Sequence, residues 1–296
     1  MDNYKITIDD VSKTVFASTC LHLAGSILTG MRRKEGDAKD NRDLLSDDEK
    51  IILKSYKVLS SIYDTLSRID MSCAFMKQSC GKHILDRLQI NIIDYSLYHY
   101  EMFCYKVSTL RDLYFKLINI LYDLKIPNQY CKWNRISEKR EKINNEFLFS
   151  LLEDNRNYLK IINVRRNGTA HDGKTEHGAF DEISPYVTFT MYADKMPGLD
   201  DCMNINRNYY LQYRLKESRK NFQKEVEICR YNAFIYARCI LCSLSDRFFE
   251  ILSNETKSKY KDSLEKALLS SMEGMVCENL KYPHNCMNAR IKNGEF

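Results

Sequence analysis

The sequence is poor in the residues that end regular structure. Its 296 residues include only four prolines and ten glycines, whereas an all-β sandwich or barrel needs frequent turns. Apolar residues instead recur at helical spacing along almost the whole chain. We therefore expect an all-α fold, a bundle of long helices with one glycine-rich loop excursion.

A strong charge of either sign is also missing. The 45 Lys and Arg against 40 Asp and Glu leave a net charge of +5, which permits a local basic surface but does not by itself indicate nucleic acid. The acidic first ten residues do not resemble a secretory signal, and eleven cysteines are an odd number for a disulfide framework. Reduced thiols and a cytoplasmic location follow as expectations.

Long hydrophobic runs are few. Residues 14–31 lack formal charge, but they include His22, three Thr, two Ser and two Gly, which is too polar for a confident membrane span. We expect this stretch to form a buried helix of a soluble protein that does not contact a membrane.

The helical pattern divides the chain into an N-terminal helical segment (1–80), a bundle (82–280) and a polar tail (281–296). Ser46 and Glu49 have capping-box spacing and predict a helix that runs to about Lys77. The next long segment is apolar on two stripes, which places it in the middle of the bundle. The expected helices cover residues 9–33, 46–77, 82–126, 137–167 with a possible break near Asp154, 200–253 and 257–280.

The excursion is expected over residues 168–198, where four of the ten glycines and two of the four prolines lie. Within it, Tyr186–Tyr192 is the one convincing short strand or extended piece.

The excursion opens with Arg165-Arg166-Asn167-Gly168-Thr169-Ala170-His171. Arg166 and His171 are five positions apart, about 140° around an unbroken helix, so they would converge only if the helix breaks near Gly168. A guanidinium matches phosphate, and an imidazole exchanges protons near neutral pH. With a ribose 2′-hydroxyl as nucleophile, such a pair can cleave RNA without a metal ion or cofactor.

The pattern Arg-Asn-x-x-Ala-His resembles the R-x4-6-H motif of HEPN domains (higher eukaryotes and prokaryotes nucleotide-binding). The resemblance implies an α-helical bundle and a metal-independent endoribonuclease of a toxin or antiviral-defence system. It also implies a homodimer with a composite site, RNA as the partner, and control by an antitoxin or accessory protein. Arg166, Asn167 and His171 would be the motif residues, although Arg165 also satisfies the spacing.

Several alternatives stay open. The motif could serve a non-catalytic HEPN-like module that binds RNA, a nucleotide or a partner protein, or it could be a solvated helix end with His171 as a polar cap. Glu101 and Asp112 share one helical stripe, and each must face water or meet a partner such as Arg165 or Arg166. His99 is expected to be a hydrogen-bonded core histidine, and His177 is expected to be a loop residue rather than a phosphate ligand.

Other chemistries have little support. Cys239 and Cys242 have CxxC spacing but sit in an apolar helix, where both are expected to pack in the core. Cys277, Cys286 and His284 lack a fourth ligand. No Walker loop, dinucleotide-binding glycine motif or nucleophile elbow is present. The basic cluster within residues 214–220 is a modest candidate for contact with the RNA backbone.

Overall fold

The computed structural model describes residues 6–34, 44–78, 81–172, 177–192 and 205–274. Within these ranges the regular elements are all helical, as the sequence predicts, and no helix is both long and apolar enough to cross a membrane. The elements are α1 (Ile8–Ser12), α2 (Val15–Lys34), α3 (Asp47–Lys77), α4 (Lys82–Leu88), α5 (Ile92–Leu121), the 3-10 turn η2 (Asn128–Tyr130), α6 (Trp133–Ser137), α7 (Arg140–Ile143), α8 (Glu146–Asp172), α9 (Ser184–Tyr192), α10 (Ile205–Ser243), α11 (Ser245–Ile251), α12 (Asn254–Lys259) and α13 (Lys261–Gly274).

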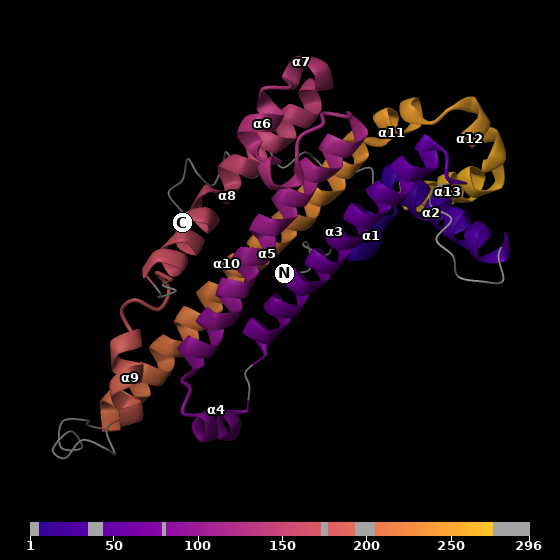
Figure 1. Cartoon of the computed structure of the whole chain (residues 1–296). Coiled ribbons are helices and arrows are strands. Elements are labelled where there is room, and N and C mark those ends of the chain that lie inside the picture. Colours follow the sequence, from indigo (N-terminus) through magenta and orange to yellow (C-terminus); the bar gives the residue numbers. More distant parts are fainter. Residues whose placement is uncertain (1–5, 35–43, 79–80, 173–176, 193–204, 275–296) are drawn as a thin grey trace.

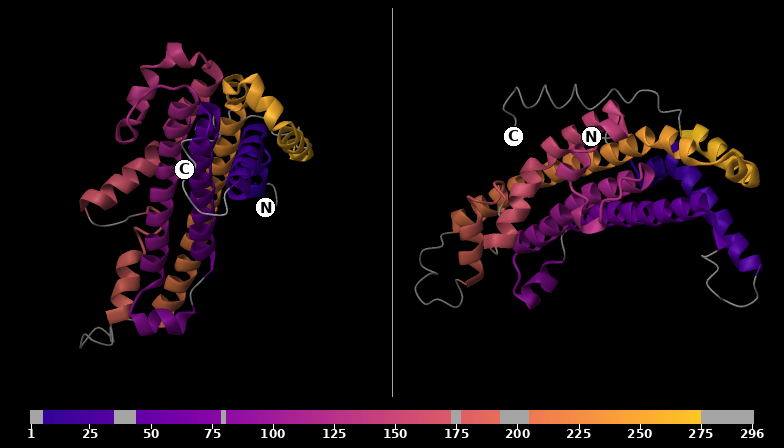
Figure 2. Two further views of the ribbon diagram at one scale, coloured as in Figure 1. Left: turned by 45° about the vertical axis from the view of Figure 1, so that its right-hand side comes forward. Right: turned by 45° about the horizontal axis from the view of Figure 1, so that its top comes forward.

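Four long helices form the centre of the molecule. Helix α3 packs against α5, α5 against α8, α8 against α10, and α10 returns to α3. The bundle is elongated, and α3 and α5 run side by side along much of its length (Figures 1 and 2). Helices α2 and α13 pair with each other at one end, where α2 also packs on α3.

The beginning of α3 is tied to the C-terminal helices. Ser46 and Glu49 form the expected capping box, in which the Ser46 Oγ accepts from the Glu49 N–H at 3.2 Å and the Glu49 carboxylate accepts from the Ser46 N–H at 2.9 Å. The same carboxylate accepts hydrogen bonds from Lys259 Nζ at 2.6 Å and from the Tyr260 hydroxyl. A helix cap therefore also links α3 to the end of α12.

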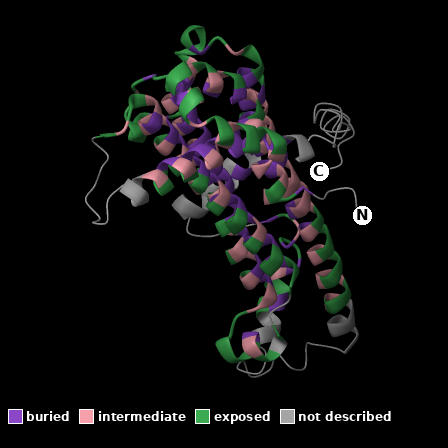
Figure 3. Cartoon of the chain, turned by 90° about the vertical axis from the view of Figure 1, so that its right-hand side faces the viewer, coloured by how far each residue is buried: buried purple, intermediate pink, exposed green. Residues whose placement is uncertain are grey.

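Helix α5 occupies the middle of the bundle. Its side chains Phe103, Leu110 and Leu117 are buried, and α3 and α8 flank it on two sides. The expectation of a central helix covered by more than one neighbour is confirmed. The buried residues form one core that extends from Ile6 to Leu252 (purple in Figure 3).

Several expected long helices are interrupted. Lys13 and Thr14 separate α1 from α2, and Leu244 separates α10 from α11. The helix expected over 82–126 is divided by Gln89, whose φ of 54° is left-handed, and α5 ends before two more left-handed residues, Asp123 and Lys125. None of these residues is a glycine, so the turns carry no obvious sequence signal.

The excursion is more helical than expected. Helix α8 continues through Gly168 to Asp172, and the predicted strand at Tyr186–Tyr192 is wrong because these residues belong to α9. Ile183 and Val187, one helical turn apart, are both buried, and the Val187 N–H donates to the Ile183 carbonyl at 3.0 Å. Burial at this spacing favours a helix over the two-residue alternation of a strand.

Candidate functional site

The predicted motif lies in the last two turns of α8. Arg165, Arg166, Asn167 and His171 all fall within the helix, whose backbone is described through Asp172. Their side chains lie outside the described part of the structure. The roles of these four residues therefore stay predictions.

The helix through the motif is continuous, so the break near Gly168 that would bring Arg166 to His171 does not occur. On an α-helix, position 166 is about 140° from position 171 and position 165 about 120° from it, whereas position 167 is one turn away on the same face. Within one copy of α8, positions 167 and 171 therefore lie on the same face of the helix, and both arginine positions lie on other faces.

The chain that follows the motif is anchored by His177. His177 lies in a loop, as expected, but its imidazole is only 3% exposed. Its ring meets Tyr100 of α5 edge-on at 5.0 Å between centroids and Phe222 of α10 at 4.8 Å. A histidine that packs in this way fixes the chain six residues after His171 against two bundle helices.

The two ring nitrogens of His177 have different surroundings. Nδ1 accepts from the Ala179 N–H at 3.2 Å, which leaves the proton of the neutral ring on Nε2. Nε2 lies 3.2 Å from a carboxylate oxygen of Glu225, within ion-pair distance but outside hydrogen-bond geometry. Spacing in the sequence gives no signal for this contact, because α9 and the first half of α10 separate the two residues.

The acidic residues expected to support the motif lie on α5. Glu101 and Asp112 share one stripe of this helix and are each partly buried. The Asp112 carboxylate accepts from Arg111, with the oxygen 3.2 Å from Nε and 3.1 Å from Nη2. Contact of either acid with Arg165 or Arg166 stays a prediction.

The basic cluster on α10 is partly neutralised. Arg214 pairs with Glu182 at 2.7 Å and with Glu217 at 3.4 Å. Arg219 is half-buried, its Nε finds no hydrogen-bond partner in the described part of the chain, and burial lowers the pKa of its guanidinium. Of this cluster, Lys216 and Lys220 remain exposed to solvent.

The cysteines offer no metal site in the described ranges, where no three His, Cys, Asp or Glu side chains gather closely enough to hold an ion. Cys239 packs against the core, and burial raises the pKa of its thiol to about 11. Cys242 is exposed, contrary to the expectation that both would pack in the core. Cys277, His284 and Cys286 lie outside the described residues.

The comparison with protein families agrees with the helical bundle and with the resemblance to HEPN domains. The model of the Cthe2314-like HEPN family matches residues 53–230, which is more than half of the chain and includes all of α5 and α8 and most of α3 and α10. The protein therefore belongs to the HEPN family. No curated protein and no solved structure matches the chain.

Proposed function

We propose that this HEPN protein is a metal-independent endoribonuclease of a defence or toxin-type system. The observation that carries the proposal is that the family match spans Arg165–His171, the one segment where arginine, asparagine and histidine stand in the R-x4-6-H pattern. In this mechanism His171 exchanges a proton with the ribose 2′-hydroxyl or the leaving oxygen, and Arg166 stabilises the charged phosphorane.

The continuous α8 supports a composite site. Because one helix turns position 166 away from position 171, an arginine from one copy of the chain would meet the histidine of a second copy. We propose a homodimer in which two α8 helices lie across one cleft. An antitoxin or accessory protein that covers this cleft would then silence the enzyme.

The first test concerns the chemistry of cleavage. The purified protein should cut single-stranded RNA in the presence of EDTA and leave 2′,3′-cyclic phosphate and 5′-hydroxyl ends, because attack by the 2′-hydroxyl needs only proton transfer and charge stabilisation. Cleavage that disappears with EDTA and returns with magnesium would contradict the mechanism.

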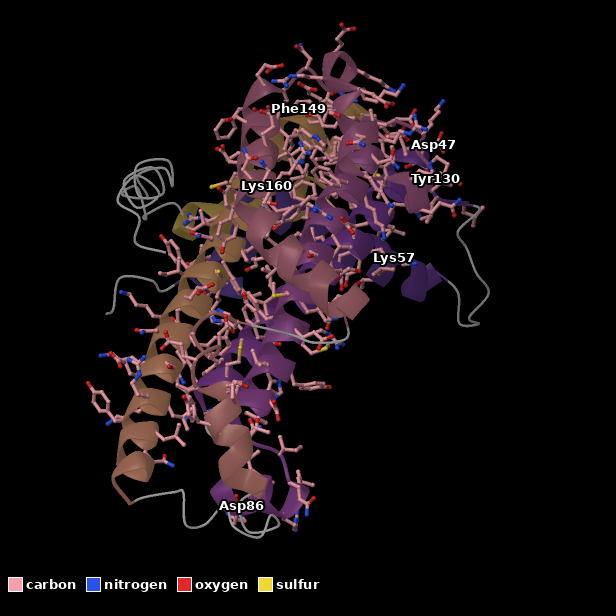
Figure 4. The ribbon with its side chains drawn as sticks, turned by 90° about the vertical axis from the view of Figure 1, so that its left-hand side faces the viewer. Asp47, Lys57, Asp86, Tyr130, Phe149 and Lys160 are labelled. Atoms are coloured by element: carbon pink, nitrogen blue, oxygen red, sulfur yellow. The ribbon has the colours of Figure 1, made fainter. Side chains whose placement is uncertain are left out.

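The second test separates an enzyme from a binding module. His171→Ala and Arg166→Ala should each abolish cleavage with little change in melting temperature, and loss of the general acid/base alone should cost about 10²–10⁴ in rate. His83→Ala on α4 and Lys160→Ala on α8 are matched controls, since both side chains are exposed and lie outside the motif (Lys160 is labelled in Figure 4).

In a binding module, by contrast, His171→Ala should leave RNA affinity nearly unchanged at neutral pH, and Arg166→Ala should weaken it. If the motif only ends a helix, either substitution should lower the melting temperature and neither should affect RNA. Full cleavage by the His171→Ala protein would end the catalytic assignment.

A further inference from the structure

Large apolar side chains gather on the outer side of the α3–α5 pair. Isolated exposed apolar residues are ordinary on a protein surface, but a contiguous group marks an interaction site. Tyr98 is 62% exposed and Met71 is 53% exposed, and their neighbours are more than one-third exposed. The group comprises Met71 and Phe75 on α3 and Tyr98, Met102 and Tyr105 on α5.

Aromatic rings join the two helices across this surface. Phe75 stacks on His99 with centroids 4.9 Å apart and planes at 28°. Tyr95 and Tyr98 meet His99 edge-on at 4.6 Å and 5.4 Å. Burial lowers the pKa of His99, which favours the neutral imidazole, and the ring is one more flat group in this stack. His99 is thus a half-buried part of a stack rather than the hydrogen-bonded core histidine expected from the sequence.

The same stripes continue into basic residues. Since α3 and α5 run antiparallel with Phe75 beside His99, steps of seven residues place Arg68 level with Lys106, and Lys57 lies near the level of Lys116. Helical spacing puts Lys57, Arg68, Met71 and Phe75 on one stripe of α3, and Tyr98, Met102, Tyr105 and Lys116 on one stripe of α5. We call these residues, with Lys106, Tyr95 and His99, the α3–α5 face.

The positive charge of the α3–α5 face is only partly neutralised by carboxylates in the described part of the chain. Arg68 pairs with Asp64 at 2.9 Å. Lys57, Lys106 and Lys116 have no ion-pair partner in the described part of the chain, and Asp112, which shares the α5 surface, is paired with Arg111 (Lys57 is labelled in Figure 4). The face therefore offers flat rings at one end and, along the rest, three lysines without an ion-pair partner in the described part of the chain. Arg68 is paired with Asp64, and the Glu101 carboxylate also lies on the α5 stripe.

We propose that the α3–α5 face binds single-stranded RNA. Unpaired bases stack on aromatic rings and phosphates bind cations, which is the combination found here. The stripe from Tyr98 to Lys116 is about 27 Å long at 1.5 Å per residue, enough for several nucleotides. A second copy of the chain fits less well, because a two-fold interface on this face would bring unpaired lysines together.

This proposal deepens the proposed function and rests on it: it assigns the surface that holds the RNA outside the motif.

The experiment uses the full-length His171→Ala protein, so that the RNA stays intact, and measures fluorescence anisotropy of a labelled 12-nucleotide single strand. Tyr98→Ala and Phe75→Ala should each weaken binding by about 5- to 150-fold, the range that one base stack supplies. Tyr98→Phe keeps the ring and should keep the affinity. Tyr130→Ala, which removes an equally exposed tyrosine beyond the end of α5, is the matched control (Figure 4).

The lysines are tested by salt. Lys106→Ala should reduce the slope of log affinity against log salt by about 0.7, the value for one phosphate contact with a single strand. Lys266→Ala on the distant helix α13 should leave the slope unchanged. A duplex of the same sequence should bind more weakly than the single strand, because its bases are already stacked.

Unchanged affinity in the Tyr98→Ala and Phe75→Ala proteins would overturn the proposal. So would a lack of any RNA binding by the His171→Ala protein, whether or not the unsubstituted protein cleaves RNA. A change of sedimentation coefficient with RNA affinity unchanged would assign the face to a second copy instead. Conversely, RNA binding that depends on the α3–α5 face, without any cleavage, would uphold the face and contradict the nuclease, so the two proposals fail separately.

Discussion

Glu49 illustrates how one buried charge is kept ionised in this fold. The residue is only 3% exposed, and burial by itself would raise its pKa, but hydrogen bonds from Lys259, Tyr260 and the Ser46 backbone outweigh that effect and lower it. A buried carboxylate with this many donors stabilises the protein only while it is ionised.

The first prediction concerns acid sensitivity. Because the pKa of Glu49 is lower in the folded than in the unfolded protein, its contribution is present above the usual value of 4.5 and is lost as the pH falls through the folded value. Urea unfolding should show that the free energy of unfolding drops below about pH 5, and less steeply in Glu49→Gln. Equal slopes in both proteins would show that Glu49 is not responsible.

The residues of the site were only partly predictable. Arg166, Asn167 and His171 stand in a recognisable local pattern, so a short sequence window is enough to find them. The anchoring of His177 by Tyr100, Phe222 and Glu225 joins three segments that are distant in sequence. Only the packing of α5 and α10 brings them together, and no local spacing encodes it.

At the scale of elements, α5 makes the second prediction. Phe103→Ala removes a fully buried ring in the middle of this helix and should lower the free energy of unfolding by about 3–5 kcal/mol. Tyr98→Ala on the exposed side of the same helix should change it by less than about 0.5 kcal/mol. Denaturant titrations of the two variants measure both values, and comparable losses would mean that the two faces of α5 are wrongly assigned.

The bounds of a helix were predictable where a capping motif and a stripe of apolar residues indicate the same helix. The start of α3 at Asp47 and its end at Lys77 follow from the capping box and the apolar stripe. Residues 186–192 look extended because threonine, valine and aromatic residues are common in strands. However, Pro185 fits the first turn of a helix, and Ile183 and Val187, one helical turn apart, pack into the core. Tertiary burial overrides the local preference there.

At the scale of the whole molecule, the composite site makes the third prediction. If Arg166 of one copy and His171 of another form one active site, mixing the inactive Arg166→Ala and His171→Ala proteins should restore cleavage. Random exchange makes half of the dimers mixed, each with one intact site of two, so about a quarter of the activity should return. Subunits must be exchanged before the assay, for example by brief dilution and reconcentration.

Each variant alone provides the background for that experiment. A mixture as inactive as its components would favour a site completed within one copy, or one that needs both arginines and both histidines at once.

Helix α10 has a further consequence for how the molecule opens. It is geometrically continuous from Ile205 to Ser243, yet residues 211–220 include no buried side chain, whereas Ala233–Ala237 are buried without interruption. Local unfolding of residues 211–220 exposes little apolar surface, whereas local unfolding of Ala233–Ala237 requires buried side chains to leave the core. In hydrogen–deuterium exchange, amides of residues 211–220 should therefore exchange orders of magnitude faster than those of residues 233–241. One unbroken helix would then contain two segments of different local stability. The less protected segment is the one that follows the motif and α9 in the chain.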